Sequence, residues 1–166
     1  TEPTAGSDFS AIQTRAYKAK NGWIINGQKS WIVNARFAQF ALVFAKCGEP
    51  SDGSQIGAFL VDLTDKNIER YPQEAYFPQK SIGTGGFHLN DVWVDADQLI
   101  LSPGDGFKQI LKEINAARTY VAAMSNAMLS KALCELREYS SERYLFSKRL
   151  CELQVWKNDV YSAQKA

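Results

Sequence analysis

The sequence predicts an α+β fold, in which an antiparallel β-barrel or sandwich precedes the long helices of an incomplete helical bundle. Over the first hundred residues, short apolar runs are separated by Gly, Pro, Asn and Asp at the spacing typical of strands in a barrel or sandwich. From residue 107 onward, apolar residues recur every three or four positions, as they do on one face of a helix. The breaker-rich segment 102–106 separates these patterns, so we predict a β domain at 1–102 and the start of a helical domain at 103–166.

The strongest strand signal is a predicted hairpin at residues 21–34. Two apolar runs flank Asn26-Gly27, a dipeptide that favours a tight type I′ turn. Its tryptophans, Trp23 and Trp31, either fill the β core or form a flat aromatic wall. The glycine-rich segment 83–86 lacks the lysine of a phosphate-binding loop, and we interpret it as a tight turn. The other predicted strands are 12–16, 40–46, 56–63, 68–73 and 88–94, with a loop at 48–54.

The helical pattern predicts a first helix of roughly 30–40 residues, far longer than the globular average. Such a length suits a bundle or an oligomer interface. A second helix is predicted at 150–164. The apolar stripe of the first helix consists of Phe107, Ile110, Leu111, Ile114, Ala117, Val121, Met124 and Met128.

Composition argues against several classes of function. The chain carries 19 basic and 18 acidic residues, a balance that argues against a nucleic-acid or membrane-surface partner. No apolar run has the length of a membrane span. The cysteines are scattered without a CxxC motif, which predicts a reducing interior. His88 is the only histidine and has no ligand-spaced Cys or carboxylate, so we predict a structural histidine and neither a metal site nor a Ser-His-Asp triad.

The first eight residues, TEPTAGSD, form a dense cluster of turn-forming residues. The hydroxyls of Thr1, Thr4 and Ser7 and the amides around Gly6 can donate to a flat polar ligand, or the hydroxyls can instead stabilise a local turn. The chain opens without Met and closes inside a helical pattern, so we expect it to be a piece of a longer protein, truncated at both ends.

Four separated features resemble the acyl-CoA dehydrogenase family. TEPTAGSD resembles the loop T-E-P-x-A-G-S-D that opens the family's middle domain, and NGQKSWIVN at 26–34 resembles its N-G-x-K-x-W-I-T-N segment. In the helical part, Arg118 stands where the family has an Arg in its first long helix, and SERYLF at 141–146 resembles E-R-x-x-F-G. The resemblance covers essentially the whole chain. It implies an oxidoreductase that holds FAD between a β domain and a four-helix domain, in a homodimer or homotetramer.

The resemblance also implies which residues hold the cofactor. The first loop and the W-I-V segment (residues 31–33) would line the flavin ring. An indole can stack on the ring, and loop amides can donate to its polar edge. Arg143 would reach the FAD pyrophosphate, in the family from a neighbouring subunit, and its planar guanidinium matches phosphate oxygens. Gln154 lies where a Gln contacts the adenylate half. The implied cofactor-binding residues are Thr1, Glu2, Pro3, Thr4, Ala5, Gly6, Ser7, Trp31, Ile32, Val33, Arg143, Tyr144, Leu145, Phe146, Leu153 and Gln154.

The implied reaction is α,β-dehydrogenation of an acyl-CoA thioester. A carboxylate removes the α-proton while the β-hydrogen leaves as hydride to flavin N5. The usual base lies beyond Ala166, so no catalytic base is assigned in this chain, and these 166 residues alone are expected to be inactive. Arg118 either supports the site or forms a structural ion pair with a helix acid. The implied substrate-binding residues are Ser7, Asn115, Ala116, Ala117 and Arg118.

Four positions depart from the family pattern. Val33 replaces a Thr whose hydroxyl bonds the flavin, and Ser147 replaces a Gly. Asn115 replaces a common acidic residue, and Ala117 stands where some members place the catalytic Glu. Two alternatives therefore stay open: a non-catalytic flavin-binding or scaffold relative, and a flavin monooxygenase on the same fold. The resemblance further implies electron-transferring flavoprotein as a candidate partner, in a bacterial cytoplasm or a mitochondrial matrix.

Overall fold

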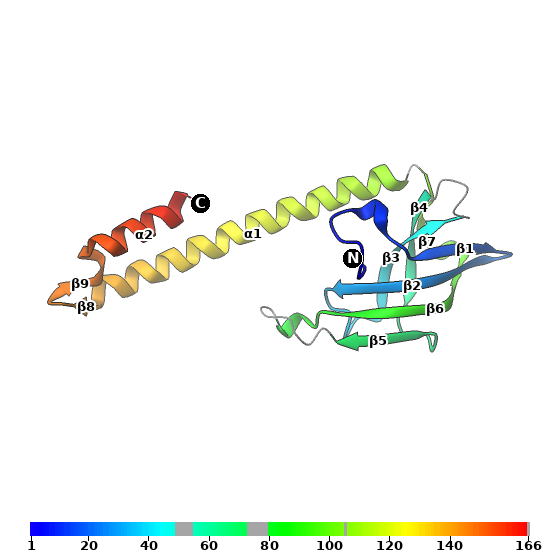
Figure 1. Cartoon of the computed structure of the whole chain (residues 1–166), viewed down its shortest axis with the longest axis horizontal. Helices are drawn as coiled ribbons and strands as arrows, with labels where there is room; N and C mark the ends of the chain where they lie inside the picture. The colour runs from blue at the N-terminus through cyan, green and yellow to red at the C-terminus, as the bar shows by residue number, and fades with distance from the viewer. Residues whose placement is uncertain (49–54, 73–79, 105, 166) are drawn as a thin grey trace. The chain divides into compact units, whose positions relative to one another are not determined.

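The computed structural model describes residues 1–48, 55–72, 80–104 and 106–165 (Figure 1). The chain divides into two compact units, Thr1–Leu111 and Lys112–Ala166. Residues 49–54 of the predicted loop lie outside the described residues.

The first unit is built on a seven-stranded sheet with the order β5-β6-β2-β1-β3-β4-β7. The α+β class is confirmed, but β1 and β3 are parallel, so the sheet is mixed rather than wholly antiparallel. The parallel pair arises because β2 pairs antiparallel with β1 and the chain then returns to the other edge of β1 in the original direction. The strands are β1 (Arg15–Ala19), β2 (Gly22–Ile32), β3 (Phe40–Cys47), β4 (Gln55–Asp62), β5 (Ile68–Pro72), β6 (Gly85–Asp95) and β7 (Leu99–Leu101), with short 3-10 helices at Phe9–Ala11, Lys80–Ile82 and Ala96–Gln98.

The core of this unit lies between the two halves of the sheet. In Figure 1, β3 and β4 run across the direction of β2 and β6. Trp23 of β2 contacts Phe59 of β4 edge-to-face, with ring centroids 5.3 Å apart. Ile25, Val43 and Phe87 are almost completely buried beside them. Each such side chain contributes about 1.5–3 kcal/mol by leaving water, so the core fixes the strands that position the site.

The predicted hairpin turn at Asn26-Gly27 is wrong. The tight connection is Lys20-Asn21, because Ala19 pairs with Gly22, and β2 continues through residue 27. Gly27 instead lies at a register shift with φ of 152°, where an added Cβ would lie 2.5 Å from Thr14 Oγ1. Glycine is needed there because the segment just before β1 approaches closely at Thr14.

The predicted tight turn at 83–86 is also wrong. Gly85 and Gly86 belong to β6, although Gly83 has a positive φ of 61°. An added Cβ on Gly86 would lie 2.4 Å from the Lys29 carbonyl oxygen and 2.4 Å from the Tyr71 hydroxyl. The absent side chain therefore makes room for a tyrosine from the neighbouring strand.

After β7 the chain forms the helix α1 (Gly106–Glu142) and a hairpin of β8 (Tyr144–Leu145) and β9 (Lys148–Arg149). A 3-10 helix at Leu150–Glu152 and the helix α2 (Gln154–Lys165) follow. The 37 residues of α1 agree with the predicted length. The second helix begins later than predicted because 150–152 form a separate 3-10 turn. Along the predicted stripe, Ile110 is buried, whereas Leu111, Val121 and Met128 are exposed. None of the helices in the described residues is long and apolar enough to cross a membrane.

Candidate functional site

The N-terminal loop is closed on itself by two main-chain hydrogen bonds. The Glu2 amide donates to the Ala5 carbonyl at 2.8 Å, and the Ala5 amide donates to the Glu2 carbonyl at 3.2 Å. Both residues are buried, and their amides are therefore not available to a ligand. Thr1, Pro3, Thr4, Gly6 and Ser7 are exposed. These five residues, rather than the whole predicted set 1–7, form the accessible face of the loop.

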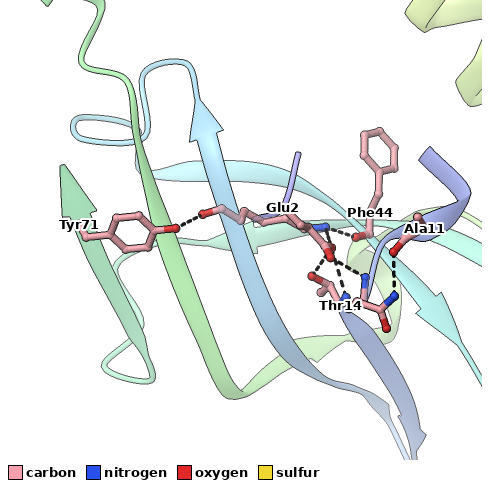
Figure 2. Close-up of polar contacts among 7 residues, drawn as sticks. Glu2, Ala11, Thr14, Phe44 and Tyr71 are labelled. Atoms are coloured by element: carbon pink, nitrogen blue, oxygen red, sulfur yellow. Dashed lines mark hydrogen bonds and ion pairs between the residues drawn. The ribbon is translucent and has the colours of Figure 1, made fainter. Parts of the chain in front are cut away.

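The Glu2 side chain binds other parts of the first unit instead of facing solvent (Figure 2). Its Oε1 accepts hydrogen bonds from Lys29 Nζ at 2.6 Å and from Thr14 Oγ1 at 2.6 Å, and its Oε2 accepts one from the Gln13 amide. Lys29 Nζ also donates to the Phe44 carbonyl at 2.7 Å. The predicted strand 12–16 begins only at Arg15, because the amides of Gln13 and Thr14 donate to Glu2.

Burial and pairing act in opposite directions on the charges of Glu2 and Lys29. Burial alone would raise the pKa of Glu2, but hydrogen bonds from Gln13, Lys29 and Thr14 together hold that pKa below its ordinary value. Burial lowers the pKa of Lys29, and the adjacent Glu2 carboxylate offsets this only in part. The two charges therefore depend on each other, as expected of a buried pair.

The accessible face of the loop lies beside the end of β2. The Ser30 amide donates to the Thr1 carbonyl at 3.1 Å, which joins the loop to the residue before Trp31. Trp31 is 46% exposed and Val33 is 64% exposed, while Ile32 is partly buried. The structure thus brings together the loop and the W-I-V segment. It does not bring Trp23 to Trp31, because Trp23 lies in the core.

A β-bulge interrupts the pairing of β2 with β6 near the C-terminal end of β2. Between Lys29 and Ile32 the register with β6 advances three residues on β2 but two on β6. Trp31, within the bulge, has a φ of 60°, in the left-handed region that bulky residues rarely adopt. Bulges commonly redirect side chains next to functional sites. Here the bulge accompanies an exposed indole next to the loop.

In the helical unit, the predicted substrate-binding residues 115–118 form one turn of α1. Arg118 Nη1 donates to Asn115 Oδ1 at 3.3 Å, and Ala116 and Ala117 are exposed. Within the described residues, no salt bridge joins Arg118 to a helix acid. The Arg118 guanidinium lies on an exposed surface.

The predicted phosphate-binding residues lie directly after α1. Arg143 is exposed, and Tyr144 and Leu145 form β8 in a hairpin that the sequence did not predict. Phe146 and Ser147 form its two-residue turn with φ of 51° and 63°. Gln154 opens α2 and donates to Asn158 at 3.0 Å, and Leu153 is partly buried.

The possible metal ligands and nucleophiles of the chain, including His88 and Cys47, do not form a second candidate site among the described residues. In the described ranges, no group of three His, Cys, Asp or Glu side chains is placed to hold a metal ion. The ring of His88 lies 5.2 Å from that of Tyr71, between centroids. Burial raises the pKa of the Cys47 thiol to about 11, which makes it a poor nucleophile.

Comparison with known families decides the assignment. Residues 1–92 match the acyl-CoA dehydrogenase middle domain, and residues 104–164 match the acyl-CoA dehydrogenase C-terminal domain. The chain belongs to the acyl-CoA dehydrogenase family. This family consists of flavoprotein oxidoreductases.

Individual relatives agree with this assignment. Cyclohexane-1-carbonyl-CoA dehydrogenase from Syntrophus aciditrophicus (strain SB) is 33% identical over 146 residues, which are 88% of this chain and 38% of that protein. Butyryl-CoA dehydrogenase from Megasphaera elsdenii superimposes with a TM-score of 0.88 at 30% identity, covering 99% of this chain and 43% of that one. A glutaryl-CoA dehydrogenase from Mycobacterium smegmatis, solved with FADH2, has a TM-score of 0.86 at 25% identity and covers 98% and 40%. The chain thus spans less than half the length of these relatives.

The accessible residues of the loop and of β2 fit the flavin of this family. Flavin is a flat ring with apolar faces and polar edges. The exposed Trp31 and Val33 offer apolar surface, and the loop that carries the exposed Thr4 and Ser7 is joined to this segment through the Ser30–Thr1 hydrogen bond. At Gly6 an added Cβ would meet nothing within 4 Å, so the loop backbone is open to close approach. Glu2 does not fit as a direct ligand, because its carboxylate is buried and fully engaged.

Sequence reasoning missed the residues that support this face. Lys29 lies inside the NGQKSWIVN segment but received no role, and Thr14 and Tyr71 lie outside every motif. Neither Lys29 nor Tyr71 carries a local sequence signal of its contacts, because these depend on residues distant in the chain.

Proposed function

We propose that the chain is part of an FAD-dependent acyl-CoA dehydrogenase that catalyses α,β-dehydrogenation of an acyl-CoA thioester. One observation supports this most directly: the Ser30–Thr1 hydrogen bond joins the donor-rich loop to the strand end that exposes Trp31 and Val33. In this proposal residues 1–102 form the middle β domain and residues 103–166 open the C-terminal helical domain.

In the proposed enzyme, Thr1, Thr4, Gly6 and Ser7 present hydroxyls and main-chain groups to the polar edge of the flavin. Trp31, Ile32 and Val33 cover its ring and exclude water from it. FAD, when bound, would accept the β-hydrogen of the substrate as hydride. The buried Glu2 and Ala5 shape the loop from within and make no side-chain contact with the ring, whereas Pro3 lies on its accessible face.

The helical unit supplies the other proposed contacts. Arg143 offers a planar guanidinium to the pyrophosphate, next to Tyr144, Leu145 and Phe146, and Leu153 and Gln154 lie on the adenylate side. Ser7 and the turn 115–118 contact the acyl-CoA. The Arg118 guanidinium helps to order the substrate site. The carboxylate base is supplied from outside this chain. We further propose a homodimer or homotetramer that passes electrons to an electron-transferring flavoprotein, in a bacterial cytoplasm or a mitochondrial matrix.

A second candidate function rests on Val33. This side chain is 64% exposed on the proposed flavin face but has no hydroxyl to donate to the ring. A non-catalytic relative that binds flavin without turnover would tolerate this change, and so would a flavin monooxygenase on the same fold.

The test uses the native polypeptide that contains this chain. We expect it to be purified with FAD, identified by its visible absorbance, and to lose that absorbance when short-, medium- or long-chain acyl-CoA is added without oxygen. A matched Val33→Thr variant should bleach at least as fast, because it restores a donor hydroxyl. Flavin that stays oxidised with every acyl-CoA favours the second candidate, and a protein that binds no FAD contradicts both.

A further inference from the structure

One tyrosine hydroxyl contacts three consecutive residues of β2 immediately before Trp31. The Tyr71 hydroxyl accepts a hydrogen bond from Gln28 Nε2 at 2.8 Å, donates to the Lys29 carbonyl at 2.9 Å and lies 2.6 Å from Ser30 Oγ. Figure 2 shows Tyr71 reaching the main chain of β2 from the side opposite the Glu2 carboxylate. Lys29 is therefore held at its side chain by Glu2 and at its carbonyl by Tyr71.

The next residue along β2 after these three adopts a strained backbone. Trp31 has a φ of 60° within the bulge, a conformation that is unfavourable for a non-glycine residue. Such a conformation persists only where surrounding contacts over-determine it. Contacts of this kind converge on residues 28–30, since Tyr71 bonds all three and Thr1 accepts from the Ser30 amide.

The fold makes room for the tyrosine at this place. Tyr71 lies on β5, and β6 separates β5 from β2 in the sheet order. Its ring can cross β6 because Gly86 has no side chain, and an added Cβ there would lie 2.4 Å from both Tyr71 Cζ and its hydroxyl oxygen. The hydroxyl of a residue on β5 thus reaches β2 across the strand between them.

We propose that Tyr71 is a positioning residue whose hydroxyl fixes the bulge of β2 and thereby sets the orientation of Trp31. The flavin part of this inference rests on the proposed function, in which Trp31 is one of the residues that cover the ring. Tyr71 acts through the main chain of residues 28–30. Its effect on Trp31 exists with or without a bound cofactor.

The first measurement reads Trp31 in flavin-free protein. Tryptophan is replaced by 5-fluorotryptophan in the native polypeptide, and the fluorine resonance of Trp31 is assigned by its loss in Trp31→Phe. We expect Tyr71→Phe, which keeps the ring and removes only the hydroxyl, to shift and broaden this resonance. The matched control Tyr17→Phe removes a hydroxyl from the outer face of β1 and should leave it unchanged.

The second measurement is the FAD dissociation constant together with the visible circular dichroism of the bound flavin. Loss of the hydrogen bonds of this partly buried hydroxyl predicts about tenfold weaker FAD binding in Tyr71→Phe. A changed flavin dichroism would show an altered ring environment, which a loss of overall stability alone does not produce. Tyr17→Phe should match the wild type in both.

The outcomes separate the two hypotheses. An unchanged Trp31 resonance in Tyr71→Phe overturns the positioning role. A wild-type protein that binds no FAD contradicts the proposed function, and the resonance then decides the positioning role alone. If Tyr71→Phe loses its far-UV dichroism, Gln28→Ala replaces it, since this removes one bond to the same hydroxyl from a partly exposed residue. It should shift the Trp31 resonance by a smaller amount, and no shift counts against the proposal.

Discussion

The two units of this protein hold left-handed residues in different ways. In the β unit, Trp31 has a φ of 60° and follows three residues bonded to Tyr71. In the helical unit, Phe146 and Ser147 have φ of 51° and 63° in the two-residue turn of the β8–β9 hairpin, and Phe146 is 85% exposed. The strain at Trp31 is offset by a partly buried hydrogen-bond network, whereas the strain at the hairpin is local. Substitutions near Trp31 should therefore disturb many contacts, and those at the hairpin few.

The charge pairs of the two units show the same contrast. Lys29 and Glu2 approach to 2.6 Å with side chains only 6% and 3% exposed. Lys131 and Glu135 of α1 approach to 3.2 Å with side chains 72% and 63% exposed. Water screens the second pair, and such pairs contribute little to stability. The first pair cannot lose one member without leaving a buried charge.

The largest predicted effect is therefore at Lys29. We expect Lys29→Met to lower the free energy of unfolding by about 3–5 kcal/mol, because Glu2 would remain buried without its cation. The matched substitution Lys131→Met in the exposed pair should change that free energy by less than about 0.5 kcal/mol. Urea unfolding followed by circular dichroism measures both.

A double variant sharpens this prediction. Glu2→Gln/Lys29→Met removes both charges, so it should recover much of the stability that Lys29→Met loses. Equal losses for Lys29→Met and Lys131→Met would contradict the contrast between the two units. So would a double variant less stable than both single variants.

A smaller effect, of opposite sign, is predicted at the hairpin. Ser147→Gly should stabilise the protein by about 0.5–1 kcal/mol, because glycine adopts a φ of 63° without the strain that a Cβ causes. Ser147→Ala keeps the Cβ and should give no gain. Thermal unfolding of the three proteins measures the difference, and a Gly variant no more stable than the Ala variant would show that the turn is unstrained.

Much of the fold can be predicted from the sequence pattern, and the predictions that were wrong have a common cause. The apolar runs of β3, β4 and β6 and the period of α1 are local signals, and each element formed where predicted. The turns predicted at Asn26-Gly27 and Gly85-Gly86 were wrong because glycine is common in turns and its presence in a strand gives the same sequence signal. In the fold, Gly27 leaves room for Thr14, which lies just before β1, and Gly86 leaves room for Tyr71 of β5. Only the tertiary neighbours distinguish these two uses of glycine.

The candidate site shows the same limit. The motif residues of the loop and of β2 were recognisable, and the structure places the two segments side by side through Ser30 and Thr1. The sequence did not reveal which of these residues are accessible and which are buried, because Glu2 is as polar as its exposed neighbours. Its burial depends on Lys29 and Thr14, which are distant in the chain. Exposure is a property of the assembled sheet, and no single segment encodes it.

The last prediction concerns acid stability and isolates the buried pair. Because the pKa of Glu2 is lowered in the folded state, the unfolded chain binds more protons between the two values. The stability due to Glu2 is therefore complete above its unfolded pKa, near 4.5, and is lost as pH falls through the lower folded value. We expect the free energy of unfolding to fall more steeply in the wild type than in Glu2→Gln/Lys29→Met as pH decreases below that point. Asp8 and Asp62, whose pKa values are lowered by hydrogen bonds from Ser10 and Thr64, belong to both proteins and cancel in the difference. Urea unfolding across the acidic range measures both curves, and parallel curves would mean that Glu2 titrates alike in the folded and unfolded chains.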